Sequence, residues 1–214
     1  MTNRYKGLKP FDQTYLMAIF IPVNYHKRKY PPNIVSSVEE IAANFGKNSI
    51  PSCQRYSLHT EYSFTKRPLT DEFSEKYPAI SSSNHRGIPI LWAGEQWTEE
   101  FIEFVKEITY GQPVPEIIEV HPPFVDTCGT IDEFLDVYEP FEKEIVKQFP
   151  NITICIENRS RSQYTKSKFL ISTLDDIRDL LSKIDDRRYG LKMAVDYPQL
   201  FTAYHKDPKD ISMD

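Results

Sequence analysis

Three side chains that can bind a metal ion or move a proton each follow a short apolar run. His121 follows Ile-Ile-Glu-Val, Glu157 follows Ile-Thr-Ile-Cys-Ile, and Asp196 follows Leu-Lys-Met-Ala-Val. Such runs are typical of strands, and in a parallel sheet or barrel the carboxyl ends of the strands converge on the functional face. We therefore expect the three side chains to share one pocket, and a hard divalent metal ion is the simplest reason to gather them.

The runs that precede these residues belong to an alternation of strand-like and helix-like segments. Residues 15–23 form a continuous apolar run, which is typical of a strand covered on both faces. Five further segments are predicted as strands: 54–64, 88–93, 116–120, 151–156 and 191–195. The segment 66–87 is rich in proline, serine and charge, and it gives the weakest prediction.

Helix-capping signals lie between the predicted strands. The segment 36–46 begins with Ser-Ser-Val-Glu and predicts a helix whose apolar face is made of Val38, Ile41, Ala42 and Phe45. Thr98 is expected to cap a second helix. Thr130 and Thr173 each begin a capping box, and the helix after Thr130 is expected to be long and bent at Pro140.

The alternation defines a fold class. Six β units separated by helices predict a parallel sheet, because right-handed crossovers through helices are the ordinary way to join parallel strands. A doubly wound sheet and a barrel both fit. No GxGxxG or GxxxxGK[ST] pattern follows a predicted strand, which disfavours a nucleotide-binding fold. We predict an α/β protein with a parallel sheet, as a single domain over residues 1–214.

Composition excludes several classes of protein. The 214 residues carry a formal net charge of −5 and a pI of about 5.6, so no overall basic field attracts nucleic acid or an anionic membrane. Cys53, Cys128 and Cys155 are far apart and form no CxxC pattern, which argues against a disulfide framework. No apolar run approaches the roughly 20 residues of a membrane-spanning helix. We expect a cytoplasmic protein that does not enter the membrane.

The second half of the chain carries a resemblance to a known family. Its motifs are Glu119-Val-His-Pro-Pro-Phe124, Ile154-Cys-Ile-Glu-Asn158, Thr173-Leu-Asp-Asp-Ile177 and Met193-Ala-Val-Asp-Tyr-Pro-Gln199. With the helices between them, these motifs resemble the xylose-isomerase-like TIM barrel superfamily, which includes sugar isomerases and epimerases and metal-dependent apurinic endonucleases. In that superfamily a histidine ends strand four, a Glu-Asn pair ends strand five, and an aspartate with a histidine three residues later ends strand six.

The resemblance implies roles for particular residues. His121, Glu157 and Asp196 become metal ligands for Zn²⁺, Mn²⁺ or Mg²⁺, Glu157 also becomes the catalytic group, and Asn158 orients the substrate or the neighbouring carboxylate. The chain departs from the family at Gln199, which stands where a histidine ligand is usual. The resemblance implies a TIM-barrel-like domain, but the chain has about six β/α units and no counterpart of strands seven and eight, so the barrel is expected to be incomplete.

Other residues are candidates for substrate binding beside this centre. Arg159 and Arg161 lie in a basic loop that could grip a phosphate, the alternative being a solvated loop. Trp92 could stack on a sugar ring or a base, or pack in the core. His59 could join the pocket from a neighbouring strand, or lie on the strand surface. Gln199 is the last of the predicted substrate-binding residues.

Three functions follow from these observations. The first is a metal-dependent isomerase or epimerase acting on a sugar or sugar phosphate. The second is metal-dependent cleavage of a phosphodiester in nucleic acid, which normally needs more histidines. The third is a non-catalytic barrel that binds a ligand or a partner protein. An incomplete barrel has open strand edges, which a second copy of the chain or the segment 1–11 is expected to cover.

Overall fold

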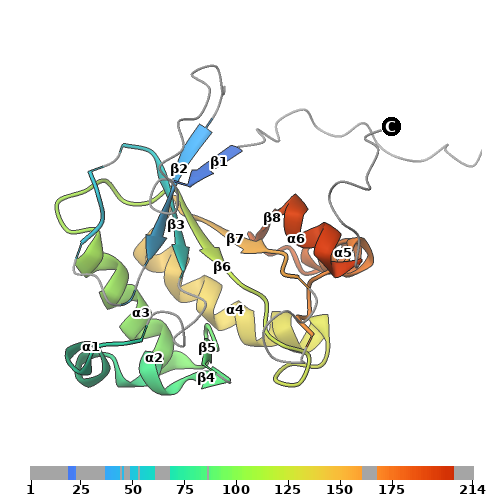
Figure 1. Ribbon diagram of the computed structural model, residues 1–214, viewed down its shortest axis with the longest axis horizontal. Coiled ribbons are helices and arrows are strands. Elements are labelled where there is room, and N and C mark those ends of the chain that lie inside the picture. Colours follow the sequence, from blue (N-terminus) through green and yellow to red (C-terminus); the bar gives the residue numbers. More distant parts are fainter. Residues whose placement is uncertain are drawn as a thin grey trace, which may run out of the picture.

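The computed structural model describes residues 19–22, 37–43, 45, 49–52, 54–60, 68–85, 87–160 and 168–204. Six strands form one parallel sheet in the order β1-β2-β3-β6-β7-β8 (Figure 1). Their bounds are β1 Ile19–Pro22, β2 Ser37–Ala43, β3 Tyr56–Thr60, β6 Ile117–Val120, β7 Thr153–Glu157 and β8 Lys192–Ala194. The protein is therefore an α/β protein built on a parallel sheet.

The strand order rises from one edge to the other without a reversal. A doubly wound sheet has a point at which the order reverses, and ligands bind there. Within the described residues the sheet has no such point, and β1 and β8 are its two edges. The strands all run in one direction, so their carboxyl ends lie together.

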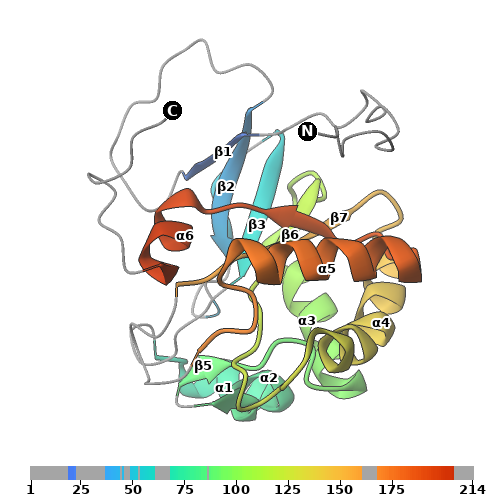
Figure 2. The same cartoon turned by 90° about the vertical axis from the view of Figure 1, so that its right-hand side faces the viewer.

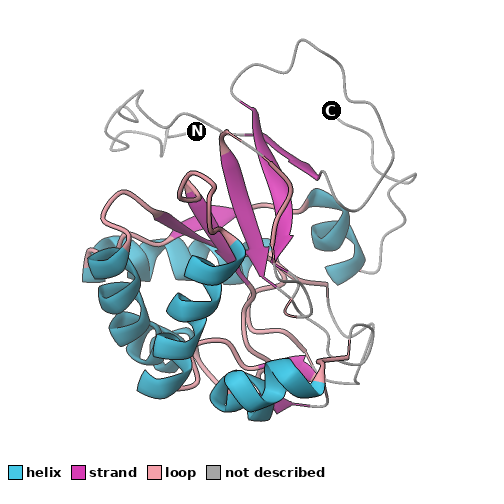
Figure 3. Ribbon diagram, turned by 90° about the vertical axis from the view of Figure 1, so that its left-hand side faces the viewer, coloured by secondary structure: helices cyan, strands magenta, loops and turns pink. Residues whose placement is uncertain are grey.

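The remaining elements lie beside the sheet and beyond the carboxyl ends of its strands. The three long helices pack along one face of the sheet, and α4 contacts both α3 and α5 (Figures 2 and 3). The short helices and a small antiparallel hairpin, β4–β5, lie beyond the strand ends. These elements are α1 Asp71–Lys76, α2 Pro78–Ser82, β4 Asn84–His85, β5 Ile88–Pro89, α3 Glu95–Ile108, α4 Ile131–Gln148, α5 Leu174–Arg187 and α6 Tyr197–Ala203.

The capping boxes predicted at Thr130 and Thr173 are confirmed. The Thr130 hydroxyl accepts a hydrogen bond from the backbone of Glu133 at 3.1 Å, and the Glu133 carboxylate accepts one from the backbone of Thr130 at 3.1 Å. Thr173 and Asp176 make the same exchange at the start of α5. These reciprocal bonds satisfy backbone N–H groups that have no partner inside the helix, so they fix where α4 and α5 begin.

The two faces of the sheet differ in chemistry because side chains alternate along each strand. One set is apolar and packs against the helices: Leu58, Ile118, Val120, Ile154 and Ile156 contact a core that includes Phe101, Val105, Phe134, Leu135 and Leu180. The alternate set on β3, β6 and β7 includes Ser57, His59, Glu119 and Glu157. A small separate apolar cluster, Ile117, Cys155 and Ala194, lies on this second face. The ionisable side chains His59, Glu119 and Glu157 thus lie on one side of the sheet.

The helix predicted over 36–46 is wrong. Residues 37–43 form β2, which pairs with β1 on one side and β3 on the other. Ile41, Ala43 and Phe45 are buried, which is a two-residue period rather than a helical one. Pairing along both edges supplies the backbone partners that a helix would have supplied internally, so the tertiary setting overrides the local capping signal.

Two predictions in the middle of the chain also need correction. Residues 88–93 add no strand to the main sheet, because only Ile88 and Pro89 are extended and they pair with β4. Pro89 has no N–H to donate, and Trp92 has a left-handed φ of 51°, so the run cannot continue as a strand. The helix expected to begin at Thr98 is α3, and its N-cap is Gly94, whose φ of 143° suits glycine.

The other predicted strands are confirmed with shorter bounds, within the described residues. The predicted strands 116–120, 151–156 and 191–195 correspond to β6, β7 and β8. Residues 15–18, 23 and 61–64, the segment 1–11, Cys53 and Arg161 lie outside the described residues. Pro140 lies inside α4, which continues through it.

Candidate metal centre

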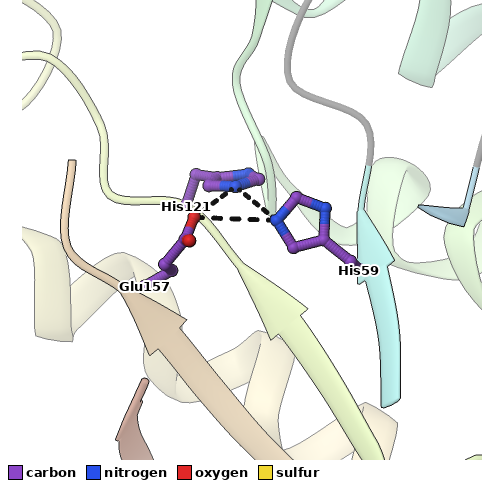
Figure 4. A group of neighbouring side chains, drawn as sticks. All are labelled: His59, His121 and Glu157. Atoms are coloured by element: carbon purple, nitrogen blue, oxygen red, sulfur yellow. Dashed lines mark hydrogen bonds and ion pairs between the residues drawn. The ribbon is translucent and has the colours of Figure 1, made fainter. Parts of the chain in front are cut away.

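His59, His121 and Glu157 meet at the carboxyl edge of the sheet (Figure 4). His59 is the penultimate residue of β3, His121 directly follows β6, and Glu157 ends β7. These three strands are neighbours and parallel, so their ends lie side by side. His121 Nε2 is 3.2 Å from His59 Nε2 and 3.1 Å from Glu157 Oε2, and His59 Nε2 is 3.6 Å from the same oxygen.

The spacing of these donor atoms is that of ligands around one small ion. In a tetrahedral zinc site, metal–ligand distances of about 2.0–2.2 Å place neighbouring donor atoms about 3.3 Å apart. Octahedral Mg²⁺, with ligands at about 2.0–2.1 Å, gives about 2.9 Å. The three distances of 3.1, 3.2 and 3.6 Å lie closer to the tetrahedral value. His59, His121 and Glu157 therefore form a candidate metal-binding triad.

Burial and neighbouring groups together set the protonation of His121 and Glu157. Burial is the largest influence on His121 and, with the positive charge of Arg159, lowers the pKa of His121 to about 3. Burial also raises the pKa of Glu157, but hydrogen bonds from His121 and His59 and the charge of Arg159 outweigh it and hold that pKa well below its usual range. At neutral pH the triad thus offers a neutral imidazole and an ionised carboxylate, the forms that bind metal.

Arg159 is the fourth member of this cluster. Its Nη1 donates to Glu157 Oε2 at 2.9 Å, the same oxygen that faces the two histidines. Its guanidinium carbon lies 5.9 Å from the centre of the Phe169 ring, and its backbone N–H donates to Ile171 O at 2.9 Å. Arg159 is only 7% exposed. The structure thus brings this predicted substrate-binding residue into the site, with its position fixed from two sides.

Asp196 is not among the three residues whose donor atoms meet in the triad. Its carboxylate caps α6: Oδ1 accepts from Gln199 N and Oδ2 accepts from Gln199 Nε2, both at 3.0 Å. This is the N-cap arrangement, which satisfies the first backbone N–H groups of a helix. Burial raises the pKa of Asp196, and Gln199 opposes that effect through its two hydrogen bonds.

Asn158 and Gln199 connect the loops that follow β7 and β8. Asn158 Nδ2 donates to Asp196 O at 3.0 Å, and Asp196 N donates to Asn158 Oδ1 at 2.8 Å. Gln199 Oε1 accepts from Ser160 N at 2.9 Å. These hydrogen bonds hold the segment that carries Glu157 and Arg159 against the loop that follows β8. The predicted substrate-binding roles of Asn158 and Gln199 stay predictions.

A pocket opens beside His121 and contains a second histidine. It is lined by residues of the β5 region and of the loop after β6, among them His85, Trp92, His121, Phe124 and Thr127. His85 Nε2 lies 3.0 Å from Asp126 Oδ2, and its ring lies 5.8 Å from that of Phe124. Trp92 is buried against Phe134, Tyr138 and Phe141 while it lines this pocket.

Analysis of the sequence named His59 as a substrate-binding candidate rather than a ligand and did not single out His85. His59 lies in the Ser-Leu-His alternation that places every second residue of β3 on the polar face, and this alternation was the signal for its position. His85 lies in the segment that gave the weakest prediction. Its proximity to His121 depends on the β4–β5 hairpin, which a local sequence pattern does not specify.

Comparison of the chain with protein-family models, with curated proteins and with solved structures gives no match. Among the described helices, none combines the length and the apolar character needed to cross a bilayer.

Proposed function

We propose that this protein is a metal-dependent enzyme with a TIM-barrel-like fold, in which His59, His121 and Glu157 hold one divalent ion. The single observation that carries the proposal is the meeting of two buried imidazoles and one partly buried carboxylate, with donor atoms within 4.8 Å of one another. The unreversed strand order and the position of the site at the strand carboxyl ends support the barrel-like fold.

The ligand set supports zinc as the ion. Two imidazoles and one carboxylate are a set found in catalytic zinc sites, which keep a fourth position for water or substrate. Mn²⁺ remains compatible with this set, whereas Mg²⁺ prefers oxygen ligands and retains its waters. The replacement of Asp196 by His59 thus moves the expectation away from the hardest ions.

The reaction that we propose first is isomerisation or epimerisation of a sugar or sugar phosphate. When bound, the metal ion supplies Lewis acidity to a carbonyl or hydroxyl oxygen of the substrate. The protein must then move a proton between neighbouring carbons, which requires a group with a pKa near neutrality. Glu157 is a weak base because its pKa is held low, so its proposed role is that of a ligand.

We assign proton transfer to His85. It lines the pocket that His121 also lines, its side chain is 28% exposed, and Asp126 orients its ring through the 3.0 Å contact. A histidine oriented by a carboxylate is a common general acid and base. The role predicted for Trp92 fits this arrangement, because Trp92 forms part of the same wall.

The second candidate is metal-dependent cleavage of a phosphodiester. The specific observation that favours it is Arg159, a buried guanidinium beside the triad, since arginine suits phosphate oxygens. The net charge of −5 opposes it, because nucleic acid would meet no overall attraction. We therefore rank it below the isomerase.

Metal analysis and two substrate assays test the proposal. Purified protein is expected to hold one divalent ion per chain, and His121→Ala is expected to lose it. His85→Gln is expected to retain the ion but to lose turnover of an aldose and ketose panel. Cleavage of an abasic duplex, without turnover of the sugars, would support the phosphodiesterase. A metal-free protein whose properties change neither with added ion nor with chelator would support the third possibility, a non-catalytic barrel that binds a ligand or partner.

We also propose a cytoplasmic location and a second copy of the chain at an open sheet edge. The three cysteines are far apart in the sequence and form no CxxC pattern, which supports a reducing compartment. The edges at β1 and β8 carry backbone groups that pairing with another chain would satisfy. Sedimentation equilibrium tests this assembly, and a monomer at all concentrations would contradict it.

A further inference from the structure

We propose that the pocket beside His121 takes the apolar end of the metal-bound substrate, so that the sugar of the proposed reaction carries no hydroxyl on its terminal carbon. This inference rests on the proposed function, because another part of the substrate must bind an ion held by His59, His121 and Glu157. It deepens that function by naming a substrate class, the terminally deoxygenated sugars. The chemistry and the size of the pocket carry it.

The walls of the pocket are mostly apolar. Residues 88–92, Ile-Pro-Ile-Leu-Trp, supply one part of the lining, and residues 122–124, Pro-Pro-Phe, supply another. A hydroxyl buried against such walls loses its hydrogen bonds to water, whereas a methyl group gains free energy by leaving water. The composition of the lining therefore favours a carbon at the end of the substrate over a hydroxyl.

Polar groups of the lining are already hydrogen bonded within the protein. Thr127 Oγ1 donates to Phe124 O at 2.9 Å, and Pro123 O accepts from Leu170 N at 2.8 Å. The prolines in the lining have no N–H to donate. A substrate hydroxyl placed here would have to compete with these bonds, which strengthens the preference for an apolar end.

The two histidines of the lining connect this pocket to the chemistry. His121 Nε2 lies 3.1 Å from Glu157 Oε2 in the metal-binding triad, and His85 Nε2 lies 3.0 Å from Asp126 Oδ2. The ligand His121 and the proton-transfer residue proposed above, His85, thus share one wall with the apolar residues. A substrate with an oxygen on the ion can place its neighbouring carbons against that wall.

The pocket is small enough to select for the end of a substrate. Its cavity volume is about 20 Å³, and a cavity of about 10–15 Å³ holds one water molecule. There is thus room for a group of one or two heavy atoms, and the body of a sugar must lie outside. Trp92 is buried and its ring centre lies 5.4 Å from that of Phe134, so this wall cannot move aside without disturbing the core.

The experiment measures how tightly two small hydroxamates bind the Co²⁺-loaded full chain, by visible absorption. Butyrohydroxamate and 3-hydroxypropionohydroxamate bind a metal ion through the same two oxygens, and they differ at the far end, a methyl group in the first and a hydroxyl in the second. The first should bind about tenfold to a hundredfold more tightly, the usual range for an apolar pocket. The kcat/KM for a 6-deoxy sugar should exceed that for its parent sugar by a similar factor.

A pair of variants at Ile90 tests whether the preference arises in this pocket. Valine and threonine have nearly the same shape, but threonine adds a hydroxyl to the wall. Ile90→Val should keep the preference for the methyl end, and Ile90→Thr should reduce it to about threefold or less. Val137→Thr, on the exposed side of α4, is the surface control and should behave like the unmodified protein.

The outcomes separate the apolar subsite from the function on which it rests. Absence of Co²⁺ binding in the unmodified protein would overturn both. Co²⁺ binding with equal affinity for the two hydroxamates, or with tighter binding of the hydroxyl end, would overturn the subsite alone. A preference for the methyl end without turnover of any sugar would support the subsite and overturn the isomerase.

The variants give two further outcomes. A preference that Ile90→Thr leaves as large as in Ile90→Val would place the apolar end outside this pocket and would overturn the inference. If Ile90→Thr fails to fold, as judged by circular dichroism, Ile88→Thr and Ile88→Val provide the same comparison at a second lining residue, and an equal preference in that pair would contradict the inference.

Discussion

The Nε2 atoms of His59 and His121 lie 3.2 Å apart and both lie close to one oxygen of Glu157. Two neutral imidazoles can share one hydrogen bond there only if one of them carries its proton on Nε2. A metal ion removes this requirement, because both nitrogens can then present lone pairs to it. This spacing is compatible with the metal-binding role proposed for the triad.

The first prediction concerns the two histidines as ligands. His59→Ala and His121→Ala should each lower the zinc affinity by at least about a hundredfold, since loss of a supporting residue alone costs about 10–100-fold. Competition with a chromophoric chelator measures the affinity. If His59→Ala kept the full zinc affinity, His59 would not be a metal ligand.

The second prediction concerns stability. An ion that binds only the folded chain stabilises it by about 2.7 kcal/mol at a hundredfold excess over Kd. Zinc should therefore raise the Tm of the unmodified protein by several degrees and leave the Tm of Glu157→Gln almost unchanged. A dye-free thermal scan by circular dichroism measures both. Equal shifts in the two proteins would indicate binding elsewhere.

The third prediction separates Asp196 from the metal site. Asp196→Ala removes the N-cap of α6 and should cost about 1 kcal/mol of unfolding free energy. Its zinc content should stay that of the unmodified protein, because the carboxylate contacts Gln199 rather than the triad. Urea unfolding and metal analysis give the two quantities. Loss of the ion in this variant would restore Asp196 as a ligand.

The fourth prediction concerns the capping boxes. Thr130→Ala and Thr173→Ala should each destabilise the fold by about 1 kcal/mol, because each leaves a helix N–H group without its partner. Thr130→Ser keeps the hydroxyl and serves as the control. Denaturant midpoints at constant slope measure the change, and an unchanged midpoint in both alanine variants would show that the caps add no stability.

The fifth prediction concerns thiol reactivity. Burial raises the pKa of Cys155 to about 12, so the thiolate that reacts with iodoacetamide is scarce at pH 8. Cys155 should stay unmodified in the folded protein while the half-exposed Cys128 is alkylated, and guanidinium should expose both. Peptide mass spectrometry after timed quenching reads the result. Rapid alkylation of Cys155 in native buffer would contradict the burial of its side chain in β7.

Two of the three triad residues, His121 and Glu157, and much of the second half of the fold were predictable from sequence. The strands that precede His121 and Glu157 are compact apolar runs, and the helices between them begin with capping boxes, so local patterns were sufficient there. The contacts of side chains in the loops after the strands were harder to predict. Asp196 follows β8 as expected, but its carboxylate caps α6, the helix that begins one residue later.

His59 was predicted as a substrate-binding residue of the pocket, and its proximity to His121 depends on which strand pairs with β3. A strand formed by residues 88–93 between β3 and β6 would have separated His59 from His121. In the structure these residues leave the sheet, and β3 pairs directly with β6. For residues 37–43 a helix was predicted where the structure has strand β2, because Ser-Ser-Val-Glu matches a capping box as well as a strand end. Both choices depend on long-range pairing, which a single sequence window does not contain.

The pairing register of β3 has a consequence for assembly of the protein. His59 lies opposite Glu119, and a slip of one residue would turn His59 towards the helices and bring Leu58 to the polar face. Ion capture would then be abolished although the sheet itself could still form. Acquisition of the ion during refolding is thus a reporter of correct strand alignment, and its time course should match the latest step at which β3, β6 and β7 come into register.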